Sequence, residues 1–96
     1  MPIYAALGRA TNEGARSLVG FKQRHAAAVK RAEAAGCKVL GSYALLGRYD
    51  YLVILQAPDA QTAVRVLLKE VSGGNVRYET YPAFPMEEFA NLVEEG

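Results

Sequence analysis

Cysteine and histidine are almost missing from this 96-residue sequence, which has one of each, Cys37 and His25. A single cysteine cannot form an internal disulfide, and one thiol is too little for a zinc site. No pair of carboxylates has the placement that acid–base catalysis requires, and no Walker-type phosphate loop is present. We therefore expect no metal and no cofactor, and we expect a reducing, cytoplasmic location.

Long apolar runs are absent as well. No run approaches the ~20 residues that a bilayer span needs, and the opening MPIYAAL lacks the basic start and apolar stretch of a signal peptide. The hydrophobic fraction of 51% and the charged fraction of 22% are ordinary for a globular chain. We expect residues 1–96 to form a single domain with no membrane partner.

Charge is distributed unevenly behind a net value of +1. Residues 1–48 hold eight Lys and Arg against two Glu, whereas residues 49–96 hold three against eight Asp and Glu. A basic half is compatible with nucleic-acid binding. Because no basic run is continuous and no helix-turn-helix is recognisable, we interpret it as a solvated helix face and expect no nucleic-acid partner.

The predicted elements follow the order β-α-β-β-α-β, with one further helix at the C-terminus. Strands are expected at 3–11, 37–47, 49–56 and 76–81, and helices at 13–35, 57–75 and 86–93. Thr11 or Asn12 caps the first helix, which Gly36 ends, and Pro58 with Asp59 opens the second. This order is that of the ferredoxin-like α+β fold.

Both faces of the central strands are apolar. The segment YLVIL at 51–55 is apolar at every position. In the preceding strand, alternation places Val39, Tyr43 and Leu45 on one face and Leu40, Ala44 and Leu46 on the other. A small chain cannot cover both faces of its sheet. We expect a homodimer formed through the sheet faces, and higher assembly remains open.

The two central strands reverse at Gly47-Arg48-Tyr49-Asp50. Gly47 permits the positive φ of a tight hairpin, and Asp50 can accept hydrogen bonds from nearby amides. These four residues form either a turn alone or a turn that also contributes to a binding site.

The segment LGRYDYLVI, which contains this turn, resembles the signature of the GYD domain family. The resemblance runs over almost the whole chain and includes Tyr4, the helix entry at 11–14, Arg24, Gly36, APD at 57–59 and GNVRYETYPAF at 74–84. It implies a dimeric α+β barrel in which two ferredoxin-like sheets pack face to face. It implies no particular activity.

The same hairpin also resembles that of the effector-sensing domains of Lrp/AsnC regulators, in which this turn helps to bind amino acids between subunits. That resemblance makes Gly47, Tyr49 and Asp50 candidate ligand-binding residues. The DNA-binding domain of those regulators has no counterpart here.

His25 lies near the centre of an apolar stripe on the first predicted helix. At ~100° per residue this stripe faces the sheet; it comprises Leu18, Phe21, His25, Ala28, Val29 and Ala32. His25 is therefore the candidate catalytic base, or a lone haem ligand, or a core histidine bonded to a carbonyl.

Other candidate ligand-binding residues are Arg24 and the tyrosines of the strands. Arg24 lies on the flank of the stripe and either clamps an anionic ligand, pairs with an acid across the dimer or forms a surface salt bridge. We expect Tyr4 and Tyr78 to share a face with small residues such as Gly8, where large rings beside small side chains can shape a pocket. Tyr43 is included for the same reason. All these phenols can instead serve as interface packing.

Two functions remain open from the sequence. The first is a homodimer that binds a small molecule, in the manner of a sensor. The second is a small cofactor-independent oxygenase or isomerase with His25 as the base. A purely structural oligomer is a third possibility.

Overall fold

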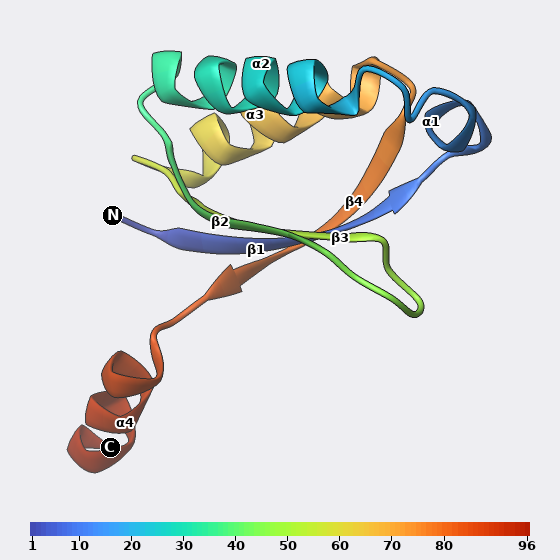
Figure 1. Cartoon of the computed structure of the whole chain (residues 1–96). Coiled ribbons are helices and arrows are strands. Elements are labelled where there is room, and N and C mark those ends of the chain that lie inside the picture. The colour runs from blue at the N-terminus through green and yellow to red at the C-terminus, as the bar shows by residue number, and fades with distance from the viewer.

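The computed structural model describes residues 1–96. Its elements are β1 (Ile3–Ala10), α1 (Asn12–Arg16), α2 (Phe21–Ala34), β2 (Lys38–Ala44), β3 (Tyr51–Gln56), α3 (Ala60–Ser72), β4 (Val76–Ala83) and α4 (Met86–Glu95). The four strands form one antiparallel sheet in the order β2-β3-β1-β4. This order confirms the predicted ferredoxin-like α+β fold (Figure 1).

Helices α2 and α3 lie side by side on one face of the sheet, and α4 lies away from them beyond the end of β4 (Figure 1). The core forms between the two layers, from Ala6 and Leu55 of the sheet and Ala32, Ala63 and Leu67 of the helices. Small side chains dominate it, which lets the helices approach the strands closely. None of the four helices is both long and apolar enough to cross a membrane.

The predicted single helix over 13–35 is wrong, because the structure has two helices with a break between them. Gly20 adopts a left-handed backbone conformation with φ of 86°, which a right-handed helix cannot contain. Leu18 and Val19 therefore fall in the connection and are largely exposed, so that Leu18 does not join the buried stripe. The rest of the stripe holds, since Ala32 is buried and His25 and Val29 are half-buried.

Thr11 is the N-cap of α1, as one of the two predicted alternatives. Its Oγ1 accepts a 3.0 Å hydrogen bond from the Gly14 amide and donates one of 2.6 Å to the Gly74 carbonyl. The Thr11 amide also donates to the Asn75 carbonyl at 3.1 Å. One residue thus starts α1 and joins it to the turn before β4.

The alternation predicted for β2 is also wrong, because a β-bulge interrupts this strand between Val39 and Gly41. Val39 pairs with Leu55, whereas Tyr43 pairs with Leu52. Residues 55 and 52 point to opposite faces of β3, so Val39 and Tyr43 do not share a face. Tyr43 lies on the face of the sheet away from α2 and α3, where it is 57% exposed.

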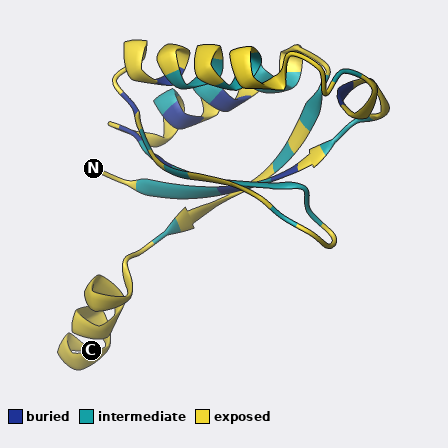
Figure 2. Ribbon diagram, in the orientation of Figure 1, coloured by how far each residue is buried: buried dark blue, intermediate teal, exposed yellow.

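Strand β4 runs two residues further than predicted and includes Pro82. Because β4 is an edge strand, a proline there need not disrupt the sheet. Only nine of the 96 residues are buried, and the exposed surface includes much of the sheet and all of α4 (Figure 2). The face of the sheet opposite α2 and α3, called the open face below, has no covering layer.

Candidate functional site

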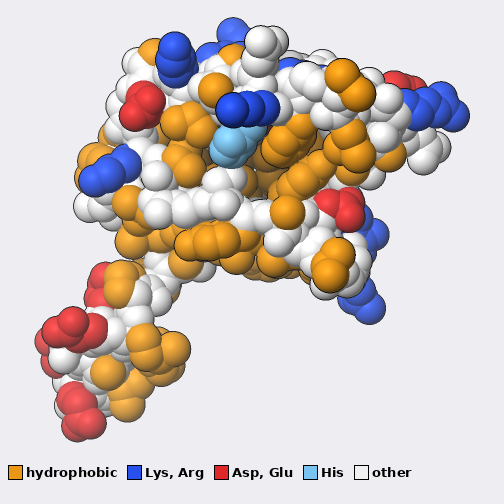
Figure 3. All heavy atoms as spheres, in the orientation of Figure 1, with side chains coloured by type: hydrophobic (Ala, Val, Ile, Leu, Met, Phe, Trp, Pro, Cys, Tyr) orange, Lys and Arg blue, Asp and Glu red, His pale blue; other side chains and the backbone are white.

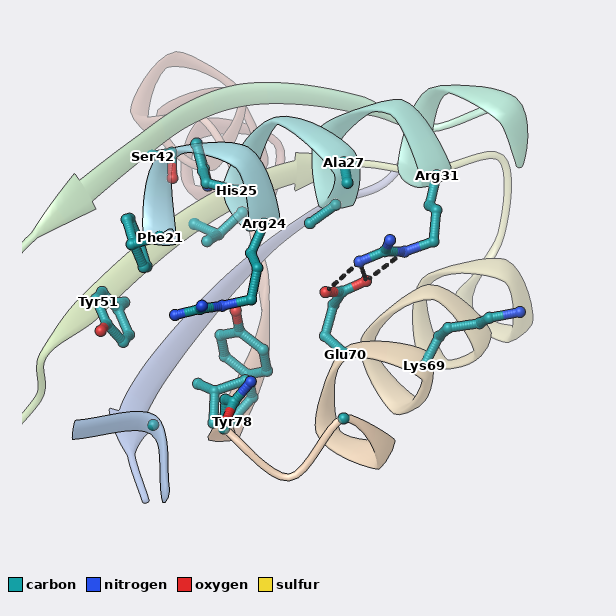
Figure 4. A pocket seen from close by; sticks show the side chains of 16 residues that line it. Phe21, Arg24, His25, Ala27, Arg31, Ser42, Tyr51, Lys69, Glu70 and Tyr78 are labelled. Carbon is teal, nitrogen blue, oxygen red and sulfur yellow. Dashed lines mark hydrogen bonds and ion pairs between the residues drawn. The ribbon is translucent and has the colours of Figure 1, made fainter. Parts of the chain in front are cut away.

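A cavity of about 320 Å³ lies between α2, the end of α3 and the helix-facing side of the sheet. Its wall combines apolar, aromatic and charged side chains (Figure 4). The lining residues are Gly14, Phe21, Arg24, His25, Ala27, Ala28, Arg31, Ser42, Tyr51, Val53, Lys69, Glu70, Gly73, Asn75, Val76 and Tyr78. Three of the predicted site residues, Arg24, His25 and Tyr78, meet in this cavity.

One wall of the cavity is a row of stacked rings. The His25 ring lies parallel to that of Phe21 with their centroids 5.9 Å apart and an angle of 6° between the planes. Phe21 in turn stacks on Tyr51 at 5.7 Å and 16°. His25 points toward the sheet, as the helical stripe predicts, and its ring packs in this row.

Arg24 lies at the rim and is held by backbone carbonyls. Its Nη1 donates a 3.2 Å hydrogen bond to the Val19 carbonyl, and its Nη2 donates to the Ser17 carbonyl. Arg24 forms no salt bridge with an acid of its own subunit, and a pair across the dimer stays a prediction. The guanidinium instead closes the connection between α1 and α2, which positions the rim of the cavity.

The two helices are joined across the cavity by Arg31 and Glu70. The Arg31 Nε and Nη2 atoms donate to both carboxylate oxygens of Glu70 at 2.9–3.1 Å (Figure 4). Hydrogen bonding and charge attraction from Glu70 raise the pKa of the Arg31 guanidinium further above its ordinary value. This forked pair fixes the spacing between α2 and α3 at the far end of the cavity.

Tyr78 lies between two cavities and lines both. Its ring lies over Gly8 of the paired strand, where an added Cβ would come within 2.8 Å of the Tyr78 ring. Burial raises the pKa of the Tyr78 phenol, with a smaller contribution from the charge of Glu70. On its other side a second cavity of about 270 Å³ runs between α3 and β4, lined in part by Tyr4 and Thr80. The predicted shared face of Tyr4, Tyr78 and Gly8 is confirmed.

The residues of the hairpin turn, 47–50, lie outside both cavities and contribute to holding the sheet together. Gly47 has a φ of 135°, the positive value predicted for it. The Asp50 amide donates to the Gly8 carbonyl, and its Oδ2 accepts from the Ala10 amide, each at 2.8 Å. Through these two hydrogen bonds the turn connects the hairpin to the end of β1.

Tyr49 extends this connection to the next strand. Its hydroxyl donates a 2.6 Å hydrogen bond to Glu79 of β4, and the Arg9 guanidinium lies 5.1 Å from the centre of its ring. Glu79 lies on the open face, as does Tyr43. The structure therefore divides the predicted site residues into a cavity group and an open-face group.

Several lining residues were not predicted, namely Phe21 of the ring stack and the pair Arg31 and Glu70, whereas Tyr51 is one of the strand tyrosines named as candidates. Phe21 stood in the predicted stripe and could have been included with His25. The pairing of Arg31 with Glu70 joins positions 39 apart in two helices, and no local pattern indicates it. No group of three or more His, Cys, Asp and Glu side chains comes together where it could hold a metal ion.

A ferredoxin-like domain with a cavity beneath its first long helix and a bare apolar face defines the structural class of this protein. Its sequence matches the GYD domain over residues 4–93, and the chain belongs to that family. A protein of Thermus thermophilus is 34% identical to it over 87 residues, which cover 90% of this chain and 92% of that protein. That relative is named glutamine synthetase and cystathionine beta-lyase binding protein. No solved structure matches the chain significantly.

Proposed function

We propose that this protein is a homodimeric binding protein that holds a small molecule in each subunit and acts on a partner enzyme. The proposal rests on one observation, which is that the two faces of the sheet differ in what lies against them. One face encloses a cavity with α2, and the other is uncovered and bears apolar side chains (Figure 3).

The open face supports the homodimer. Cross-strand register puts Tyr43, Leu52 and Leu7 in one row across it, which ends at Glu79 of β4, and Ile54, Ala5 and Tyr81 in the next. Space-filling atoms show apolar side chains along this underside of the sheet (Figure 3). An exposed apolar surface of this kind is unfavourable in water, and a second identical sheet packed against it would remove that cost from both chains.

The cavity supports the bound small molecule. Its volume of about 320 Å³ falls at the lower end of the range of small-molecule sites, roughly 300–1,000 Å³. The stacked rings of His25, Phe21 and Tyr51 offer a flat apolar wall. The Tyr78 hydroxyl and the His25 imidazole offer polar partners. This combination suits a small, partly apolar molecule with one or two polar groups.

The relative from Thermus supports the proposed binding to a partner enzyme. Its name records binding to glutamine synthetase and cystathionine β-lyase, and it aligns over nearly the full length of both chains. We propose that this chain likewise binds an enzyme, with these two as the first to test. Cys37 is a free, buried thiol in a chain without disulfides, which supports work in a reducing, cytoplasmic setting.

Native mass spectrometry on gently purified protein tests the small molecule. We expect a dimer that carries a defined extra mass, and we expect Tyr78→Phe and His25→Gln to weaken its retention. Gln23→Ala, a change at an exposed position of α2, is the matched control and should retain the mass. Empty wild-type dimers that also fail to bind any compound of a metabolite library would contradict the proposal.

His25 also lines the cavity in the position that the enzymatic alternative requires. The two functions differ in what His25→Ala removes. For a binding protein it changes retention of the small molecule with no turnover to lose, whereas for an enzyme it abolishes turnover of that molecule. Incubation of the identified compound with wild type and variant, followed by product analysis, separates them.

Association with the partner enzymes is tested separately by titration calorimetry with purified glutamine synthetase and cystathionine β-lyase of the same organism. Saturable binding to either supports the proposal. Heat signals no greater than dilution for both would contradict this part of it.

A further inference from the structure

Helix α4 is amphipathic and has nothing packed against it. Met86, Phe89, Leu92 and Val93 are each more than half exposed, and no residue of the helix is buried. Isolated helices shorter than about 12–15 residues are marginal in water, and α4 has ten. Its stability therefore requires a surface that covers the apolar side.

The position of α4 limits which surface this can be. It follows the edge strand β4 and lies on the side of the sheet away from α2 and α3 (Figure 1). Only Phe84 and Pro85 connect it to β4, and two residues span at most about 7 Å. The helix thus points into the space beside the open face, where a second subunit is proposed to pack.

A complementary surface lies on the outer side of α3. Val64 and Leu68 are more than half exposed there and line a shallow groove together with Arg65. The groove is continuous with the cavity between α3 and β4, since both are lined by Val64 and Leu68. Val64 and Leu68 lie about one helical turn apart along α3.

The charges of α4 and of the α3 groove are opposite in sign. Helix α4 carries Glu87, Glu88, Glu94 and Glu95 and no basic residue, and Figure 3 shows acidic atoms beside its apolar side. The α3 groove is lined by one charged residue, the basic Arg65. Acidic side chains beside an apolar strip and a basic side chain in the groove are the arrangement expected of two surfaces that meet.

We propose that α4 of each subunit docks on the α3 groove of its partner, with Phe89 and Leu92 on Val64 and Leu68 and its glutamates beside Arg65. The inference rests on the proposed homodimer and adds a second, reciprocal contact to it. The cavity between α3 and β4, with which the groove is continuous, and the small-molecule cavity both border on Tyr78. The docked helix of one subunit therefore lies on the outer side of the wall that its partner's ligand contacts.

Disulfide trapping between differently tagged chains tests the docking. One chain carries Val64→Cys and the other Phe89→Cys, both with Cys37→Ala, and the two are co-expressed and mildly oxidised. We expect a covalent dimer that contains both tags. A pairing of Gln23→Cys with Phe89→Cys, which puts one thiol on the exposed side of α2, is the control and should yield none.

The outcomes separate this inference from the proposed function. If sedimentation shows a dimer but the two tags are not linked, the docking is wrong and the dimer stands. If a doubly substituted Val64→Cys/Phe89→Cys chain links only within itself, α4 covers its own subunit and the docking is again wrong. A monomer in sedimentation overturns both.

Charge reversal gives an independent readout. Arg65→Glu should raise the dimer dissociation constant by about tenfold or more, because like charges then face one another. Adding Glu88→Lys and Glu95→Lys, the two glutamates nearest Leu92 at ~100° per residue, should restore it toward the wild-type value. A loss of dimer that these two changes do not reverse would contradict the docking.

Discussion

Tyr49 and Glu79 are joined across strand β1 by a hydrogen bond of 2.6 Å from the phenol to the carboxylate. Tyr81 donates to the same carboxylate oxygen at 3.0 Å. The tyrosine of the signature motif thus connects the central hairpin with the edge strand β4, and its conformation depends on one acidic residue of the open face.

The acid sensitivity of the fold should depend on Glu79. Hydrogen bonds from Tyr49, and then from Tyr81, lower the pKa of this carboxyl below its ordinary 4.5. A carboxyl with a lowered folded-state pKa contributes stability that is present above pH about 4.5 and is lost as the pH falls through the folded-state value. Melting temperature measured from pH 7 to pH 3 should therefore fall more steeply for wild type than for Glu79→Gln.

Glu33→Gln removes a carboxylate from the exposed side of α2 and is the matched control for that experiment. Its profile should follow that of the wild type. If Glu79→Gln and Glu33→Gln show the same profile, the Tyr49–Glu79 contact makes no contribution in solution.

Asp50→Ala should destabilise the hairpin. The change removes the acceptor of the Ala10 amide and leaves a half-buried backbone donor without its partner, at a cost of about 1.5 kcal/mol or more. Denaturant unfolding of Arg48→Ala, an exposed neighbour in the same turn, should differ from wild type by less than about 0.5 kcal/mol. Equal effects of the two changes would show that the Asp50 carboxylate is dispensable.

Gly14→Ala should detach α1 from the turn before β4. A Cβ at this buried position would overlap the Asn75 backbone carbonyl, which has no flexible end that can move away. We expect a loss of about 1–3 kcal/mol of unfolding free energy. Gly73→Ala, at an exposed position with an ordinary helical φ, should cost less. A Gly14→Ala protein as stable as Gly73→Ala would refute the close approach.

The alkaline limit of stability should depend on Tyr78. Because burial raises the pKa of its phenol above 10.0, the folded state favours the protonated form. Its contribution is complete below pH 10 and is lost as the pH rises through the folded-state value. Tyr78→Phe should therefore weaken the fall of melting temperature above pH 10.

The fold could be predicted from sequence because its signals are local. Thr11 and Asp59 cap their helices as expected, and Asp59 Oδ1 accepts the Thr62 amide at 2.7 Å. Gly36 and Gly47 take the positive φ values that their turns require. Each of these signals lies within a few residues of the feature that it determines.

The predictions that failed concern backbone irregularities. Apolar periodicity continues through Leu18, and only the left-handed Gly20 breaks the helix. Alternation in β2 is equally regular in sequence, but a bulge between Val39 and Gly41 reverses the face of Tyr43. Side-chain type carries little information about such interruptions, because they arise from how the whole sheet and helices fit together.

The candidate site was predictable in part for the same reason. His25 follows from helical periodicity, whereas its stacking on Phe21 and the closing pair Arg31–Glu70 depend on contacts between elements. The motif residues Tyr49 and Asp50 were predicted to bind a ligand by resemblance. In the structure they hold the hairpin against β1 and β4, and a role in binding stays a prediction.

Sedimentation velocity at low micromolar concentration, with wild type and Leu52→Lys compared, tests the central claim of a homodimer built on the open face. Leu52 lies between Leu7 and Tyr43 in the middle of that face, where a charge would be buried by a second sheet. We expect a dimer for wild type and a folded monomer, with an unchanged circular dichroism spectrum, for the variant. A monomeric wild type, or a Leu52→Lys dimer as tight as wild type, would contradict the claim.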